Sequence, residues 1–279
     1  MESIANRVRI IKGGLGIIIK GQRGRWNGTP PPERESGDIS TFSAASRRRL
    51  RETLATACGR PWGLTLTSPG DVLPADKVRG LWQEWSQHIY PRTTTNPLIW
   101  RIELQRRKQA HWHCVMLAPD GADTTGSVVS ALAVAEAWRS LVRRLCGPFY
   151  ERTDRGFELH GVKIVDLTQS TATGIVGYLC DHTSKHKQEQ LGWIGRQWGV
   201  INKRSLKSGG HTVVTVSERD HVKAARQYRR LQERLRARGG AYTGVRVTPA
   251  GNVNTAVFGR DECRLLRCYG SVINRSLEG

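Results

Sequence analysis

The chain has 279 residues, and a hydrophobic fraction of 38% is enough for one sizeable core with appended arms. Its formal net charge of +20 is too large for an enzyme with an ordinary surface acting on a neutral substrate. The charge indicates a polyanionic partner such as nucleic acid, because Lys and Arg that neutralise phosphates release counterions. The six cysteines form no Cys-x-x-Cys pair and fit no zinc-site spacing, and the apolar stretch at 13–19 is too short to cross a bilayer. We therefore expect a cytoplasmic protein with reduced thiols and no membrane partner.

Residues 1–42 are predicted to form a basic N-terminal arm and linker. Residues 8–11 and 17–19 are rich in isoleucine and valine and can pair as a hairpin around Gly13 and Gly14. The consecutive prolines within 28–37 are typical of a linker.

Residues 43–205 are predicted to form the central domain. Their patterns alternate between helical and extended periodicity. The expected strands are 63–67, 98–105, 111–117 and 162–167, and the expected helices are 43–57, 74–90, 127–145 and 171–188. This order favours an α+β fold with a central antiparallel sheet and helices packed on it.

Residues 206–279 are predicted to form a basic C-terminal region. It comprises a short strand at 212–216, a very basic helix at about 218–238, and a hairpin at 244–258 that turns at 249–252.

The segment from Trp100 to Leu117 carries the first candidate chemistry. Side chains two apart in a strand point to one side, so His111 and His113 project together while Trp112 faces the other way. If residues 98–105 are the hairpin partner, Glu103 lies across from this pair. Two imidazoles and a carboxylate can hold a divalent ion and leave positions open for a substrate oxygen.

The predicted helix at 171–188 carries the second candidate chemistry. Tyr178 is followed at helical spacing by Asp181 or His182 and then by Lys185, so these side chains share one face. A tyrosine can attack phosphorus, and a nearby lysine can neutralise charge on the phosphate.

Together the two segments resemble the HUH endonuclease superfamily, in which a bulky apolar residue separates two histidines. The closest resemblance is to the replication initiators of single-stranded DNA phages. Residues 62–67 (WGLTLT) resemble the first motif of that family, residues 100–113 the second, and residues 178–185 (YLCDHTSK) the third, in the expected order. Residues 195–200 (GRQWGV) resemble a stretch that often follows the third motif in these phage proteins.

The resemblance implies an enzyme that nicks and rejoins single-stranded origin DNA and so starts rolling-circle replication. Mg²⁺ or Mn²⁺ would polarise the scissile phosphate, with His111, His113 and Glu103 as metal ligands. Tyr178 would attack and form a 5′-phosphotyrosine link, leaving a free 3′-hydroxyl. Lys185 and His182 complete the implied catalytic set.

The remaining implied residues bind DNA. Thr65 and Thr67 lie in the first motif, and Arg196 and Trp198 can clamp and stack on bases. Core packing is an equally good interpretation of Trp198. Phage initiators often carry a second tyrosine four residues after the first, and His182 occupies that position. In single-tyrosine initiators the tyrosine stands three residues before the lysine, which is again His182.

Two alternatives stay open: a transposase of the HUH type, and a non-catalytic basic nucleic-acid-binding protein. The chain contains no Gly-x-x-x-x-Gly-Lys-Ser/Thr phosphate loop. An initiator of this type would therefore depend on a host helicase and polymerase.

Overall fold

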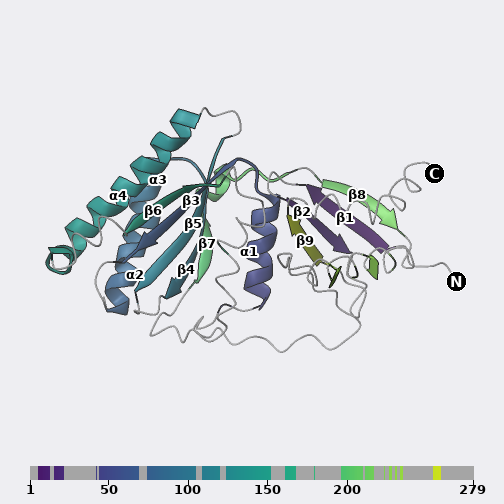
Figure 1. The fold of residues 1–279 in the computed structure, drawn as a ribbon, viewed down its shortest axis with the longest axis horizontal. Coiled ribbons are helices and arrows are strands. Elements are labelled where there is room, and N and C mark those ends of the chain that lie inside the picture. The colour runs from purple at the N-terminus through teal and green to yellow at the C-terminus, as the bar shows by residue number, and fades with distance from the viewer. Residues whose placement is uncertain are drawn as a thin grey trace.

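A computed structural model describes a large part of the chain. The described residues are 6–12, 16–21, 42, 44–68, 74–104, 109–119, 124–151, 161–167, 179, 196–209, 211–216, 223, 226–227, 230, 233–234 and 254–258. They form an α+β fold with two antiparallel sheets (Figure 1). The prediction of an α+β fold with helices on an antiparallel sheet is confirmed.

The larger sheet has five strands in the order β6-β3-β5-β4-β7. Its strands are β3 (Arg60–Thr67), β4 (Leu98–Leu104), β5 (Ala110–Ala118), β6 (Val162–Asp166) and β7 (Trp198–Ile201). β5, which carries the two histidines, is the central strand and is paired on both sides. A central strand has neighbours along both edges, so its side chains are positioned more firmly than those of an edge strand.

Gly59 ends the connection from the preceding helix into β3. Its φ is +127°, and an added Cβ would lie 2.6 Å from the carbonyl oxygen of Ala118. Only glycine fits this conformation and this close approach.

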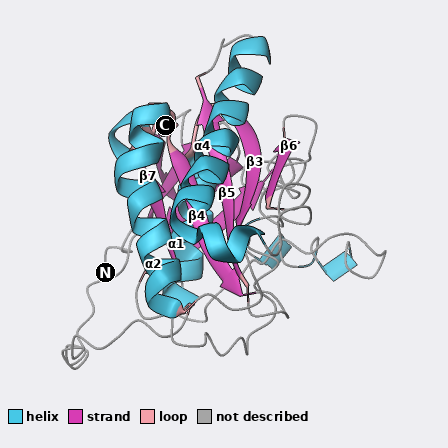
Figure 2. Ribbon diagram, turned by 90° about the vertical axis from the view of Figure 1, so that its left-hand side faces the viewer, coloured by secondary structure: helices cyan, strands magenta, loops and turns pink. Residues whose placement is uncertain are grey.

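One face of this sheet is apolar along its whole length and is covered by helices. These are α2 (Ala75–Glu84), the π-helical turn η1 (Trp85–Ile89), α3 (Tyr90–Thr93) and α4 (Thr124–Glu151). Seen from that side, α2 and α4 lie in front of the strands (Figure 2). The helix predicted at 74–90 thus continues to Thr93 through a π turn that accommodates Pro91, which has no backbone N–H to donate.

Tryptophans fill the space between these helices and the sheet. Trp82 stacks on Trp112 of β5 with ring centroids 5.0 Å apart and an interplanar angle of 7°. Trp138 of α4 meets Trp112 edge-on at 5.3 Å and donates its indole N–H to the carbonyl oxygen of Thr67 at 3.2 Å. These large, rigid rings therefore hold β5 in place from the face of the sheet that α2 and α4 cover.

The opposite face of the sheet packs against α1 (Ala44–Thr56), where Leu50 and Leu54 are fully buried against Ile99 and Val115. On its other side α1 lies against the second sheet (Figure 1). That sheet has the order β8-β1-β2-β9, with β1 (Asn6–Lys12), β2 (Gly16–Gly21), β8 (His211–Val216) and β9 (Asn254–Phe258).

The predicted N-terminal hairpin is confirmed as β1 and β2, whose register pairs Ile10 with Ile19. It is joined on either side by strands of the C-terminal region, so the two ends of the chain share one sheet. Of the hairpin predicted at 244–258, only 254–258 is described, and it pairs with β2. The part before it lies outside the described residues.

The predicted basic helix at 218–238 is described at six positions, and all of them are helical and exposed. They recur at intervals of three and four, so they lie on one face of the helix. They are Lys223, Arg226, Gln227, Arg230, Glu233 and Arg234. Within the described part of the chain, no helix combines the length and apolar character that crossing a membrane requires.

Candidate active site

The face of the five-stranded sheet that packs on α1 changes from apolar to polar along its strands. The strand register aligns Lys163 of β6, Thr65 of β3, His113 of β5, Arg101 of β4 and Trp198 of β7 in one row. Residues aligned in this way point to the same face of the sheet. One row therefore crosses all five strands and contains three of the residues predicted from the sequence.

A second row lies two residues further along these strands, near their ends. It aligns Thr67 of β3, His111 of β5 and Glu103 of β4. The expectation that Glu103 lies across from the histidine pair is confirmed by its register with His111. The two rows bring together all three predicted metal ligands and both predicted threonines.

The side chains of these rows contact one another. Glu103 Oε2 lies 3.2 Å from His113 Nε2, and both side chains are buried. His111 Nε2 and Thr67 Oγ1 are hydrogen-bonded at 3.1 Å. The two imidazole centroids are 6.0 Å apart.

These distances test whether the residues fit a divalent ion. Two atoms that each lie about 2.1 Å from a shared ion are roughly 3 Å apart. Glu103 and His113 have this spacing, whereas His111 is turned toward Thr67. Accordingly, the described part of the chain contains no set of three His, Cys, Asp or Glu side chains gathered closely enough to hold a metal. The donor types fit Mn²⁺, and His111 completes the set only if its ring turns from Thr67 toward Glu103.

Arg101 connects this face to a distant part of the chain. Its guanidinium is buried, lies 4.6 Å from the ring centroid of Phe42, and donates to the carbonyl oxygen of Leu179 at 3.3 Å. Leu179 is fully buried among the apolar residues under α1. Leu179, the residue after Tyr178, is therefore hydrogen-bonded to Arg101, which lies beside Glu103 and His113 in the sheet.

Arg101 and Lys163 also lie on this face and were not predicted from the sequence as site residues. Arg101 stands two residues before Glu103 in a predicted strand, and Lys163 is the one charged residue at the start of another. Strand alternation alone could have assigned Arg101 to the side of Glu103. Assigning Lys163 to this face required the pairing of β6 with β3, which the sequence does not indicate.

Two of the predicted DNA-binding residues lie at the edge of the sheet formed by β7. Trp198 is half-buried and packs against the apolar cluster under α1. The amide of Ile102 donates to the carbonyl oxygen of Gln197 at 2.9 Å, which extends the pairing of β4 beyond β7. Arg196, the residue before Gln197, is exposed and lies near the end of β4 that carries Glu103.

The predicted catalytic residues Tyr178, His182 and Lys185 lie outside the described residues, as does most of the helix predicted at 171–188. Leu179, within that helix, has helical backbone geometry.

The thiol of Cys114 lies directly behind this face, in the tryptophan core. Burial raises its pKa well above the usual range, so it stays protonated at neutral pH. A neutral, fully buried thiol is a packing group and neither a nucleophile nor a metal ligand.

No known protein family, curated protein sequence or solved structure matches this chain.

Proposed function

We propose that the chain is a metal-assisted endonuclease and strand transferase of the HUH type that acts on single-stranded DNA, as an initiator of rolling-circle replication. The observation that carries the proposal is that Glu103, His111 and His113 lie on the same face of the sheet, at adjacent positions of two paired strands. They come from two strands of an antiparallel sheet, beside Thr65 and Thr67 of a third.

The arrangement of these residues suits phosphodiester chemistry. Bound Mg²⁺ or Mn²⁺ would supply a Lewis acid that polarises a phosphate oxygen. Glu103 and His113, already 3.2 Å apart, would hold the ion together with His111. The Glu103 carboxylate and the His113 imidazole are buried and in contact, so two of the three proposed ligands are already in position.

Tyr178 is the proposed nucleophile. Its phenolic oxygen attacks phosphorus, the bond from phosphorus to the 3′-oxygen breaks, and a 5′-phosphotyrosine link forms. The phenol loses one proton and the departing 3′-oxygen takes up one, so the step is balanced. Lys185 would neutralise charge on the phosphate, and His182 would assist the proton transfer.

The contact between Arg101 and Leu179 supports this assignment. Consecutive Cα atoms are about 3.8 Å apart, and Tyr178 directly precedes Leu179. A buried guanidinium that bonds to the Leu179 carbonyl at 3.3 Å thus ties the segment with the nucleophile to the strand with Glu103.

The charge of the chain supports a DNA substrate. Lys163 and Arg196 are exposed at opposite edges of the polar rows. The exposed helix face with Lys223, Arg226 and Arg230 adds further positive charge. Such side chains favour phosphate contacts whose strength falls with added salt.

The test is a covalent adduct between protein and DNA. The protein is incubated with Mn²⁺ and single-stranded DNA from the replicon that encodes it, then separated on a denaturing gel. We expect an adduct that requires the metal and disappears in Tyr178→Phe. Tyr90→Phe is a matched control, because Tyr90 is buried and donates to the carbonyl of Asn96 at the other end of the sheet.

Each of three other outcomes would lead to a different conclusion. An adduct that survives Tyr178→Phe but not His182→Ala would leave the enzyme class intact and assign the segment a different essential residue. An adduct equally reduced in both tyrosine variants would point to loss of folding. Tight binding without any adduct would favour a non-catalytic DNA-binding protein.

A further inference from the structure

Arg101 is a buried cation that takes no part in the chemistry proposed above. It is 7% exposed and lies in the same row of the sheet face as His113 and Trp198. Burying a charge costs free energy unless its surroundings compensate, so the contacts of this guanidinium show what it is kept for.

Two contacts hold the guanidinium of Arg101. Its Nη1 donates to the carbonyl oxygen of Leu179 at 3.3 Å, and its central carbon lies 4.6 Å from the ring centroid of Phe42. Phe42 is half-buried just before α1 and packs against the same apolar cluster as Leu179. A planar guanidinium can stack on a ring with its face and donate from its edge at the same time, which the ammonium of lysine cannot do.

Leu179 is anchored through both its side chain and its backbone. The side chain is fully buried in the cluster that contains Leu50 and Leu54 of α1, and the carbonyl oxygen accepts the bond from Arg101. Tyr178 is one peptide unit away, about 3.8 Å between Cα atoms. Anchoring residue 179 therefore limits the positions that the residue before it can take.

The same strand carries this anchor and a proposed metal ligand. Arg101 and Glu103 are two residues apart in β4, which is paired with β5 on one side and β7 on the other. Two residues of strand span about 7 Å, and pairing on both sides keeps this distance constant. In enzymes, a displacement of about 1 Å between reacting groups can lower the rate about 100-fold.

We propose that Arg101 is a positioning residue, which holds the segment of Tyr178 at a fixed place relative to the metal ligands. It acts through the carbonyl of Leu179, and Phe42 keeps the guanidinium in place. The proposal rests on the proposed function in taking Tyr178 as the nucleophile. The anchoring of Leu179 does not depend on that assignment.

The test variants are Arg101→Gln, which removes the charge and the stacked plane, and Phe42→Leu, which removes only the ring. Three quantities are measured for each protein. They are hydrogen exchange of the peptide that contains Leu179, by mass spectrometry; Mn²⁺ affinity, by electron paramagnetic resonance; and the rate of adduct formation at saturating Mn²⁺ and single-stranded DNA. Thermal melts followed by circular dichroism establish that the variants fold.

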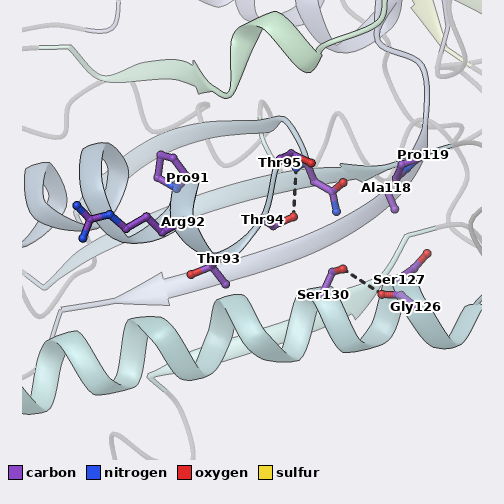
Figure 3. A pocket seen from close by; sticks show the side chains of 11 residues that line it. Pro91, Arg92, Thr93, Thr94, Thr95, Ala118, Pro119, Gly126, Ser127 and Ser130 are labelled. Atoms are coloured by element: carbon purple, nitrogen blue, oxygen red, sulfur yellow. Dashed lines mark hydrogen bonds between the residues drawn. The ribbon is translucent and has the colours of Figure 1, made fainter.

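Arg60→Gln is the matched control. Arg60 is also an arginine of this sheet, lies 5.7 Å from the ring centroid of Trp62 and bonds to Asp166 at 3.1 Å. It is paired with Ala118, at the other end of the sheet from Glu103 and His111, where Ala118 also lines a polar pocket (Figure 3). The control thus removes the same charge and the same kinds of contact, far from the candidate site.

We expect Arg101→Gln to raise exchange of the peptide with Leu179 by about tenfold or more, while peptides of β5 are unchanged. The adduct rate should fall about 100-fold. Mn²⁺ affinity should stay the same or rise, because removing a positive charge beside the site does not weaken the binding of a cation. Phe42→Leu should change exchange and rate in the same direction by less, and Arg60→Gln should match wild type in all three measurements.

The proposal is overturned if exchange near Leu179 is unchanged in Arg101→Gln, or if it rises equally in β4 and β5. It is also overturned if a loss of Mn²⁺ affinity accounts for the whole loss of rate, since Arg101 would then act on the metal site. If Arg101→Gln does not fold, Phe42→Leu decides by the same criteria. A selective rise in exchange together with no adduct from the wild-type protein would support the anchoring of Leu179 and overturn the proposed nuclease function.

Discussion

Replacing Trp112 tests whether the tryptophan core fixes the strand that carries both histidines. The side chain is 0% exposed and lies between Trp82 and Trp138. A buried tryptophan removes about 150–250 Å² from water, and at about 25 cal/mol/Å² this stabilises the fold by roughly 4–6 kcal/mol. Alanine keeps a small part of that area, so Trp112→Ala should cost about 4 kcal/mol, within the range known for such truncations.

The measurement is a urea titration followed by far-UV circular dichroism, because intrinsic fluorescence changes when a tryptophan is removed. With a slope of about 3 kcal/mol/M, the midpoint should fall by roughly 1.3 M. Leu132→Ala is the control: Leu132 is 54% exposed on α4, and its truncation should change stability by less than about 0.5 kcal/mol.

Trp112→Phe adds a finer test. Among the described residues the indole N–H of Trp112 has no hydrogen-bond partner, so phenylalanine loses apolar area but also removes an unsatisfied donor. We expect a cost of about 1–2 kcal/mol, clearly below that of alanine. A loss below about 1.5 kcal/mol for Trp112→Ala would refute the reasoning that this ring anchors β5.

Three further outcomes are expected. Glu103→Gln should weaken Mn²⁺ binding by about tenfold or more, measured by electron paramagnetic resonance, since an amide is a poorer ligand than a carboxylate; unchanged affinity would remove Glu103 from the site. Gly59→Ala should cost more than about 1 kcal/mol in the same urea titration, because φ is +127° and the new Cβ would meet Ala118. Burial raises the pKa of Cys114, so above about pH 9 the unfolded chain releases a proton that the native state keeps. The free energy of unfolding should therefore fall with rising pH, by up to about 1.4 kcal/mol per pH unit, and less steeply in Cys114→Ala; equal slopes would contradict it.

Local sequence patterns predicted most of the strands and the alignment of Glu103 with His111. Both follow from alternation and from the short connection between β4 and β5, which leaves antiparallel pairing as the simple solution. The order β6-β3-β5-β4-β7 and the sharing of one sheet by β1, β2, β8 and β9 were not predicted. The pairing of strands that are far apart in the chain leaves no local signal. The alternation of residues in a strand predicts which side chains face the core, but it does not predict which strand is the partner.

The residues around the candidate site differ in the same way. His111 and His113 could be assigned from their spacing, since a strand places both on one side. Arg101 could not be recognised as a link to Leu179, because the contact spans 78 positions. The role of Trp198 stayed open because an aromatic residue at a sheet edge serves packing and stacking with the same side chain.

The polarity of one sheet face explains where a site can lie. Every second residue of β4 and β5 points to the face that packs on α1. These residues are apolar where α1 covers them, as Ile99 and Val115 are. Further along the same face they are ionisable: Arg101, Glu103 and His113. Burying three ionisable groups in adjacent positions costs free energy, and apolar residues of similar size would stabilise a sheet face at least as well. A sequence that nevertheless keeps them buried there gains something other than stability, so we expect the cluster to serve the function of the protein. This end of the sheet is therefore the place to test first, whichever nucleophile the adduct experiment assigns.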